Sequence, residues 1–203
     1  MPDTLVDFIR HGMPAGGRRF RGHGIDDPLS EAGWQQMWDA VDDNAPWTHI
    51  VTSPLQRCHT FASALQEKHG LPVEVDTRFR EVGLGDWEGL SADEIIARDE
   101  DEYRAFYRDP QCNRPRGAEP LEAFGERVAQ ALESVFRRYH GKRVLIIAHA
   151  GVIRAALGYV MRAEPVAWYR ARIDNAAYTR FVSGPHGYRL EFHNRSQLPG
   201  RCG

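Results

Sequence analysis

The chain has 203 residues, enough for one α/β domain with a core that needs neither disulfides nor metals. Hydrophobic residues make up 42% and charged residues 27% of the sequence, which excludes disordered and fibrous proteins. The formal net charge of −2 gives no basic footprint for nucleic acid, and no stretch approaches the roughly 20 apolar residues of a membrane helix.

The first predicted element is an apolar strand within residues 4–12, which ends in Arg10, His11 and Gly12. Glycine is typical of the turn that follows a strand. A turn does not explain a cation and an imidazole at the same place, so Arg10 and His11 are candidates for function.

A helix is predicted over residues 28–41, because tryptophan, methionine and valine recur there at helical spacing. Ser30 is the predicted N-cap of this helix. In the next segment an apolar strand ends at Ser53, which we expect to cap a second helix, with Pro54 as the first helical residue and Gln56 completing a capping box.

A third segment, residues 142–161, runs from an uninterrupted apolar strand into a helix through His149. Such a strand is typical of a sheet that is covered on both faces. The remaining predicted elements are a strand at 72–76, a polar and mostly helical stretch at 91–107, a loop at 109–120, a long helix at 121–139, a hairpin at 178–193 and a loose tail after 194.

Alternation of strands and helices predicts an α/β fold, here a three-layer α/β/α sandwich with a mainly parallel central sheet. We find no internal repeat and no linker, so residues 1–203 are interpreted as a single domain. In such folds ligands bind beyond the carboxyl ends of the strands. The polar residues that follow the three strands are therefore expected to share one crevice.

Four side chains meet at that crevice in this prediction: Arg10, His11, Arg57 and His149. Two guanidinium groups suit a dianionic ligand, because the planar fork of arginine matches phosphate oxygens. A neutral imidazole between them can attack phosphorus, and a second histidine can donate a hydrogen bond to the transferred group. The pattern predicts phosphoryl chemistry.

An acid that protonates the departing oxygen is expected in the segment "TRFREVGLGDWEGLS". Glu81 lies in a loop-like stretch interrupted by glycines and has no evident structural reason there. Asp86 and Glu88 flank Trp87 and are interpreted as turn residues. The residues alone give Glu81 only a slight preference.

Three widely spaced cysteines show no metal-ligand spacing, and residues 1–20 lack the apolar core of a signal peptide. Reduced thiols and a cytoplasmic location are therefore expected. The glycine-rich segment "GRRFRGHG", residues 17–24, is interpreted as a mobile lip on the substrate side, and histidines outside the crevice, including His23, as surface residues.

The motifs "RHG", "SPLQR", "REVGLGDWEG" and "AHAG" occur in an order and spacing that resemble the histidine phosphatase superfamily, with its phosphoglycerate-mutase-like fold. The resemblance implies that His11 is the phosphorylated nucleophile, that Glu81 is the proton donor, and that Arg10, Arg57 and His149 form the phosphate pocket. It implies no metal and no cofactor, and a small phosphate ester as partner.

Within that superfamily, "DDPLSEAG", "GDWEG" and "HAGVIR" most resemble the α-ribazole phosphatase branch of cobalamin assembly. Pro14 and Gly17 stand where the family often has Ser or Thr and Asn, and Ala118 interrupts the usual Gly-Gly-Glu. These departures concern the leaving-group side. A phosphoglycerate-mutase-type phosphotransferase and a non-catalytic module that binds phosphorylated ligands stay open as alternatives, and the oligomeric state stays undetermined.

Overall fold

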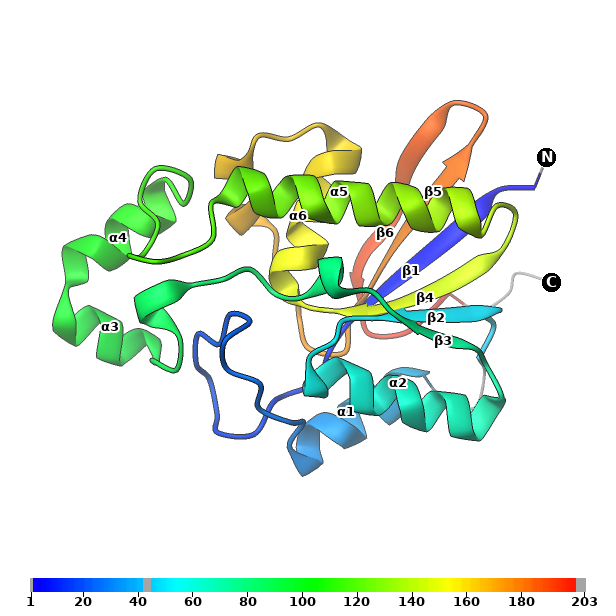
Figure 1. Cartoon of the computed structure of the whole chain (residues 1–203), viewed down its shortest axis with the longest axis horizontal. Coiled ribbons are helices and arrows are strands. Elements are labelled where there is room, and N and C mark those ends of the chain that lie inside the picture. The colour runs from blue at the N-terminus through cyan, green and yellow to red at the C-terminus, as the bar shows by residue number, and fades with distance from the viewer. Residues whose placement is uncertain (1, 42–44, 200–203) are drawn as a thin grey trace.

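The computed structural model describes residues 2–41 and 45–199, and its centre is a six-stranded sheet in the order β3-β2-β4-β1-β5-β6 (Figure 1). Strands β3, β2, β4 and β1 run parallel, whereas β5 and β6 add antiparallel strands beside β1. The prediction of a mainly parallel sheet is confirmed. The strands are β1 Thr4–Arg10, β2 His49–Thr52, β3 Val73–Val75, β4 Arg143–Ala148, β5 Tyr178–Gly184 and β6 Gly187–Arg195.

Helices cover both faces of the sheet, as a three-layer sandwich requires. In Figure 1, α1 (Glu31–Val41) and α2 (Gln56–His69) lie below the sheet, and α5 (Leu121–Arg138) and α6 (Ala150–Met161) lie above it. The long helix α5 ends one residue before its predicted end, and the C-terminal hairpin of β5 and β6 begins at the predicted residue and ends two residues later. Beyond the end of the sheet, the polar stretch forms two short helices, α3 (Ala92–Arg98) and α4 (Glu100–Arg108).

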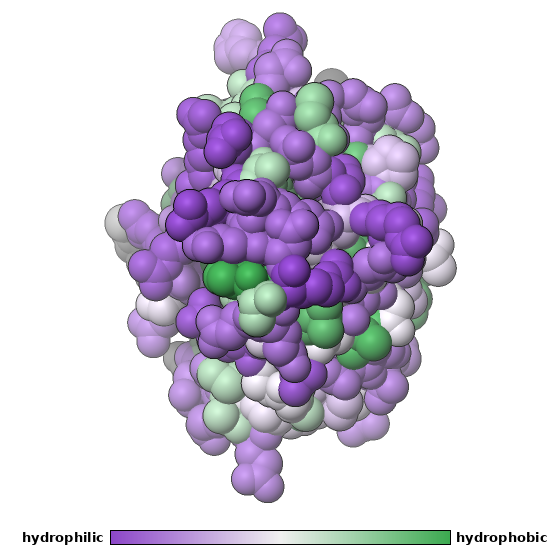
Figure 2. Space-filling view, turned by 90° about the vertical axis from the view of Figure 1, so that its left-hand side faces the viewer, coloured by the Kyte–Doolittle hydropathy of each residue, from purple (hydrophilic) through white to green (hydrophobic). Residues whose placement is uncertain are grey.

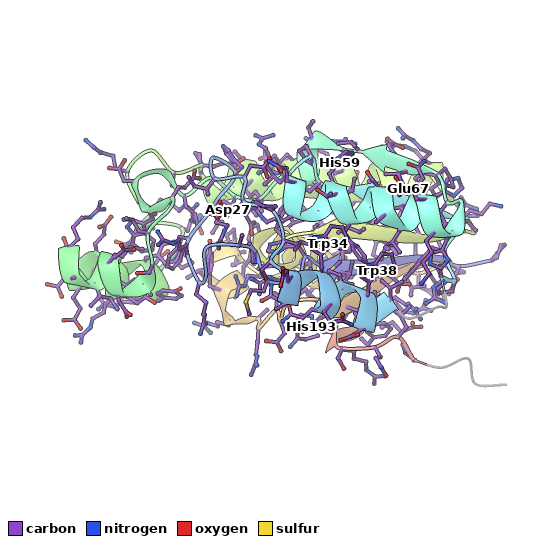
Figure 3. The ribbon with its side chains drawn as sticks, turned by 90° about the horizontal axis from the view of Figure 1, so that it is seen from below. Asp27, Trp34, Trp38, His59, Glu67 and His193 are labelled. Carbon is purple, nitrogen blue, oxygen red and sulfur yellow. The ribbon has the colours of Figure 1, made fainter. Side chains whose placement is uncertain are left out.

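Each face of the sheet packs against its own apolar core. The strand β4 is buried over almost its whole length, so that alternate side chains contribute to the two cores. On the lower side, Trp34 and Trp38 of α1, both labelled in Figure 3, contact the ring of Phe61 on α2. The ring centroids are 5.6 and 4.8 Å apart. The helical spacing of the tryptophans therefore reflects packing between helices.

The N-terminus of α2 differs from the prediction. The helix begins at Gln56, and Ser53 does not cap it, because the three residues after β2 keep a non-helical conformation. The backbone amide of Gln56 instead donates to a carboxylate oxygen of Asp26, at 2.7 Å. At the start of α1, Ser30 Oγ accepts from the amide of Gly33 at 3.0 Å, which confirms Ser30 as the N-cap.

Asp7 is a fully buried carboxylate in the middle of β1. Its oxygens accept hydrogen bonds from the indole of Trp47 at 2.8 Å, from Arg143 at 2.9 Å and from Arg180 at 2.6 Å. Two cations and an indole donor therefore offset the cost of burying this charge. The network ties β1 to β4 and β5.

We expect Asp7→Ala to lower the free energy of unfolding by about 3 kcal/mol, because it removes the buried partner of Arg180. Urea denaturation measures this difference. The control is Glu100→Ala, which breaks an exposed ion pair with Arg104 and should cost less than about 0.5 kcal/mol. Equal costs for the two variants would contradict the prediction.

The C-terminal region stays regular up to Arg195, and Leu198 beyond it still packs against the lower core. Residues 200–203, and with them Cys202, lie outside the described residues, so the predicted loose tail is only partly described. Cys58 and Cys112 are free thiols. In the part of the chain that the structure describes, no helix combines the length and apolarity needed to cross a membrane.

Candidate active site

The carboxyl ends of two neighbouring parallel strands bring the predicted site together. Arg10 is the last residue of β1 and is in register with Ala148, the last residue of β4. His11 and His149 follow directly, and their ring centroids are 5.1 Å apart. The face of the molecule turned to the viewer in Figure 2, toward which β1 runs, is mostly hydrophilic with separate hydrophobic patches.

His11 is buried, and its hydrogen bond fixes the state of its ring. The Nδ1 atom lies 2.7 Å from the carbonyl oxygen of Gly12. A carbonyl only accepts, so Nδ1 carries the proton and Nε2 keeps its lone pair in the neutral ring. Burial, followed by the charges of Arg10 and Arg57, holds the pKa of His11 well below its usual value. The imidazole is thus neutral at neutral pH, with a free lone pair on Nε2.

Gly12 allows the backbone after His11 to approach the start of α1. A Cβ atom on Gly12 would lie 2.2 Å from the carbonyl oxygen of Gly33, which is shorter than any real contact. The amide of Met13 also donates to Gln36 Oε1, at 2.9 Å. The glycine of the first motif therefore fixes the turn that carries the histidine.

Arg57 and Arg10 are held by backbone carbonyl oxygens. Arg57 donates from Nη1 to Ile25 at 3.0 Å and from Nη2 to Gly22 at 2.9 Å, and Arg10 donates from Nη1 to Ile173 at 2.6 Å. The Nε atoms of both arginines are buried and have no hydrogen-bond partner among the described residues. Burial lowers the pKa of Arg10 to about 10, so it stays charged at neutral pH. Such donors suit phosphate oxygens.

His149 is fully buried at the N-terminus of α6. Its Nε2 atom lies 2.7 Å from the hydroxyl of Ser53, the residue that the sequence placed as a helix cap. The thiol of Cys58 lies 3.6 Å from the same nitrogen. Burial, followed by the charges of Arg57 and His11, lowers the pKa of His149. Ser53 is thus a site residue that orients the second histidine.

Glu81 accepts a hydrogen bond at the same helix terminus. One carboxylate oxygen accepts from the amide of Gly151 at 3.2 Å, and the other accepts from Val82 at 2.9 Å. A Cβ atom at Gly151 would lie 2.3 Å from the Glu81 carboxylate, so a glycine is needed there. Among the charged groups, Glu81 acts most strongly on Arg10. The structure therefore brings all five predicted side chains together.

The other acidic candidates have structural partners. Asp86 forms an exposed ion pair with Arg116 at 2.8 Å. Glu88 accepts from the amides of Leu84 at 2.9 Å and Gly24 at 3.0 Å, and so joins two loops. Both behave as the turn residues that the sequence predicted.

Two predictions about residues 17–24 are wrong. Arg21 is buried, and it forms an ion pair with Asp27 and donates to the carbonyl of Gly17, both at 2.8 Å. These bonds fix the segment, which is therefore no loose lip at this point. His23, predicted as a surface residue, is half-buried, and its Nδ1 lies 3.2 Å from the carbonyl oxygen of Glu81.

Asn175 is a site residue that the sequence analysis missed. Its side-chain amide donates to the carbonyl oxygen of His11 at 2.9 Å and so fixes the backbone at this residue. Asn175 precedes β5, whose antiparallel pairing with β1 brings it there. No periodicity in the sequence marks this residue.

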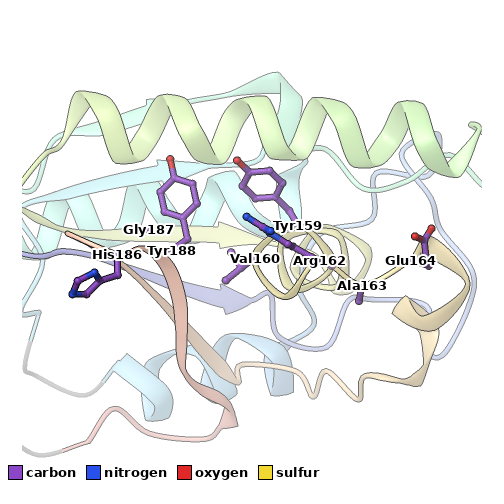
Figure 4. A pocket seen from close by; sticks show the side chains of 9 residues that line it. Tyr159, Val160, Arg162, Ala163, Glu164, His186, Gly187 and Tyr188 are labelled. Carbon is purple, nitrogen blue, oxygen red and sulfur yellow. The ribbon is translucent and has the colours of Figure 1, made fainter.

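A cavity of about 670 Å³ opens at the other end of α6, between the end of that helix and the turn of the β5–β6 hairpin (Figure 4). Tyr159, Arg162, Glu164 and Tyr188 are among its lining residues. It does not include any of the five candidate residues. Nor do the described residues place three or more potential metal ligands together at any point.

The family model for the histidine phosphatase superfamily (branch 1) matches residues 6–196. A glucosyl-3-phosphoglycerate phosphatase of Mycobacterium tuberculosis is 35% identical over 190 residues, which cover 85% of this chain and 82% of the relative. A bifunctional protein of the same organism is 30% identical over 179 residues, or 86% of this chain. The chain spans about half, 49%, of the length of that protein.

Solved structures agree with the fold. A structure called mycobacterial hydrolase 2 superposes with a TM-score of 0.85 at 27% identity, covering 99% of this chain and 94% of the other. The α-ribazole phosphatase of Shigella flexneri has a TM-score of 0.81 and covers 97% and 99%, but at 22% identity it supports the fold alone. With a family model that spans nearly the whole described chain, this protein belongs to branch 1 of the histidine phosphatase superfamily.

Proposed function

We propose that the protein hydrolyses small phosphate monoesters through a phosphohistidine at His11. The observation that carries this proposal is the ring of His11, neutral and with a free Nε2, between two arginines whose buried Nε atoms lack partners among the described residues. A dianionic phosphate supplies acceptors for those donors and matches their charge.

In the first step, His11 Nε2 attacks phosphorus as the bond to the alcohol oxygen breaks, and Glu81 gives its proton to that oxygen. In the second step, Glu81 takes a proton from water, the water oxygen attacks phosphorus, and the bond to nitrogen breaks. Inorganic phosphate leaves and Glu81 is protonated again. Arg10, Arg57 and His149 stabilise the charge on the transferred group.

Two candidates for the alcohol half of the ester have support. The motifs around Glu81 and His149 favour α-ribazole 5′-phosphate, and hence a cytoplasmic enzyme of cobalamin assembly. The 35% identity to a glucosyl-3-phosphoglycerate phosphatase supports an ester of phosphoglycerate type. Because a phosphohistidine also serves phosphate transfer, a mutase activity on phosphoglycerate is an outcome to be tested.

The test is phosphate release in EDTA from α-ribazole 5′-phosphate, 3-phosphoglycerate and p-nitrophenyl phosphate. We expect release that persists in EDTA. Conversion of 3-phosphoglycerate to its 2-isomer, without phosphate release, would indicate a mutase. Activity that EDTA abolishes and a divalent metal restores would overturn the proposed mechanism, and binding without turnover of any ester would support a non-catalytic module.

A further inference from the structure

Two half-buried arginines beside the candidate active site, Arg114 and Arg154, have no carboxylate within ion-pair distance among the described residues. Apart from Arg10 of the phosphate pocket, the other described arginines that are buried or half-buried have such a partner. Arg127 pairs with Glu119 at 2.7 Å, and Arg180 pairs with Asp7 at 2.6 Å. No ion pair with the described residues therefore neutralises the positive charge of Arg114 or Arg154.

Arg154 lies on α6 three residues after Gly151, the residue whose amide contacts Glu81, so the two share a face of the helix. Its Nε donates to the carbonyl oxygen of Ala171 at 3.0 Å, and its guanidinium carbon lies 5.2 Å from the ring centroid of Tyr169. These contacts fix the side chain. Its two terminal nitrogens make no hydrogen bond to the described residues.

Arg114 supports Tyr169, the residue whose ring lies beside Arg154. It donates to the carbonyl oxygens of Glu119 at 3.2 Å and Gly83 at 3.0 Å, and to the hydroxyl of Tyr169 at 3.3 Å. All three of its nitrogens are thus engaged within the protein. Arg114 holds Tyr169 in place, and Tyr169 in turn supports Arg154.

The carboxylates around Arg154 do not neutralise it. Asp174 is held by Arg172 at 2.8 Å and by the amide of Asn194 at 2.9 Å. The oxygens of Glu81 accept hydrogen bonds from the amides of Gly151 and Val82, and no ion pair joins Glu81 to Arg154. Arg154 and Arg10 donate to the carbonyl oxygens of Ala171 and Ile173, two residues apart, which places Arg154 beside the phosphate pocket. The charge of Arg154 also lowers the pKa of Arg10.

We infer that Arg154 binds an anionic group on the alcohol half of the substrate, so that the enzyme acts on phosphate esters that carry a second negative charge close to the phosphate. This inference rests on the proposed function. It selects a carboxylate-bearing or doubly phosphorylated ester over α-ribazole 5′-phosphate, whose alcohol half has no such group. The planar guanidinium suits either kind of oxyanion.

A matched pair of ligands tests this. In 3-phosphoglycerate a carboxylate stands where glycerol 3-phosphate has a hydroxymethyl group. Calorimetric dissociation constants are measured on His11→Ala, which does not turn either ligand over. Because a charge-assisted contact is lost, we expect glycerol 3-phosphate to bind about 10- to 100-fold more weakly. In the double variant His11→Ala, Arg154→Met, the ratio of the two dissociation constants should be close to one.

The control is Arg137→Met, which removes an exposed cation from α5 and should leave the ratio unchanged. Equal binding of the two ligands to His11→Ala, or no binding of either, would overturn the inference. So would an equal loss for both ligands in Arg154→Met, because Arg154 would then bind the transferred phosphate itself.

Kinetics on the otherwise unmodified chain separate this inference from the proposed function. Arg154→Met should raise KM for 3-phosphoglycerate more than it lowers kcat, since binding of a remote group is lost. A chain that hydrolyses both esters through His11 without preference would refute only the inference. A chain that hydrolyses neither, yet shows the binding preference, would refute only the proposed function.

Discussion

Replacing His11 with alanine is expected to lower the rate of phosphate release by at least about 10⁴-fold, because no other group can form the covalent intermediate. The loss should appear in kcat for every substrate. Stability at neutral pH should fall little, since the neutral ring makes one hydrogen bond among the described residues, to the carbonyl oxygen of Gly12. Phosphate release and thermal unfolding of the same preparation measure both effects.

The matched control is His59→Ala, which removes an exposed histidine of α2 and should retain full activity. Quenching in alkaline detergent after mixing with labelled ester should give a phosphoprotein that is stable in alkali and labile in acid with the unmodified chain, and none with His11→Ala. If His11→Ala retained more than about a hundredth of the activity, direct attack by water would replace the proposed intermediate.

Much of the site could be predicted because it depends on local rules. Arg10 ends β1, His11 and His149 directly follow β1 and β4, and Arg57 lies in the first turn of the helix after β2. Parallel strands place their carboxyl ends at one edge of the sheet. Two of these strands, β1 and β4, are neighbours in register, which brings the two histidines into contact. Chemistry at strand ends is therefore visible in the sequence itself, as polar residues that directly follow apolar runs.

The features that were missed depend on contacts between distant segments. Ser53 satisfies every local requirement of an N-cap, yet Asp26, 30 residues from Gln56, caps α2 and leaves Ser53 free for His149. Asn175 contacts His11 only because β5 pairs with β1. Local sequence preferences cannot predict these contacts, because Asp26 and Asn175 come close to their partners only when the chain folds.

Asp7 and Arg154 show the same limit for charges. A carboxylate inside an apolar strand has no explanation in the sequence, because its partners Trp47, Arg143 and Arg180 come from three other segments. Arg180 pairs with a carboxylate, whereas Arg154 has no such partner among the described residues. This contrast distinguishes the two arginines. The structure is needed to tell arginines that stabilise the fold from one that can bind a substrate.

Replacing Glu81 with glutamine should lower kcat about 10²- to 10⁴-fold for alkyl phosphates, because an amide cannot protonate the leaving oxygen. An aryl phosphate such as p-nitrophenyl phosphate leaves as a stable anion and needs no such proton. Its first step should therefore be almost unchanged. The second step still needs a base to activate water, so the phosphohistidine should accumulate.

The expected signature of Glu81→Gln is a burst of about one equivalent of p-nitrophenol per enzyme, followed by slow turnover. Asp86→Asn, which alters an exposed carboxylate of the same loop, should show neither the burst nor a dependence on the leaving group. If Glu81→Gln slowed alkyl and aryl esters equally and without a burst, Glu81 would hold the N-terminus of α6 in place rather than transfer the proton. The hydrogen bond that Glu81 accepts from Gly151 makes a structural role the main alternative to proton transfer. The dependence of the rate on the leaving group distinguishes these two roles.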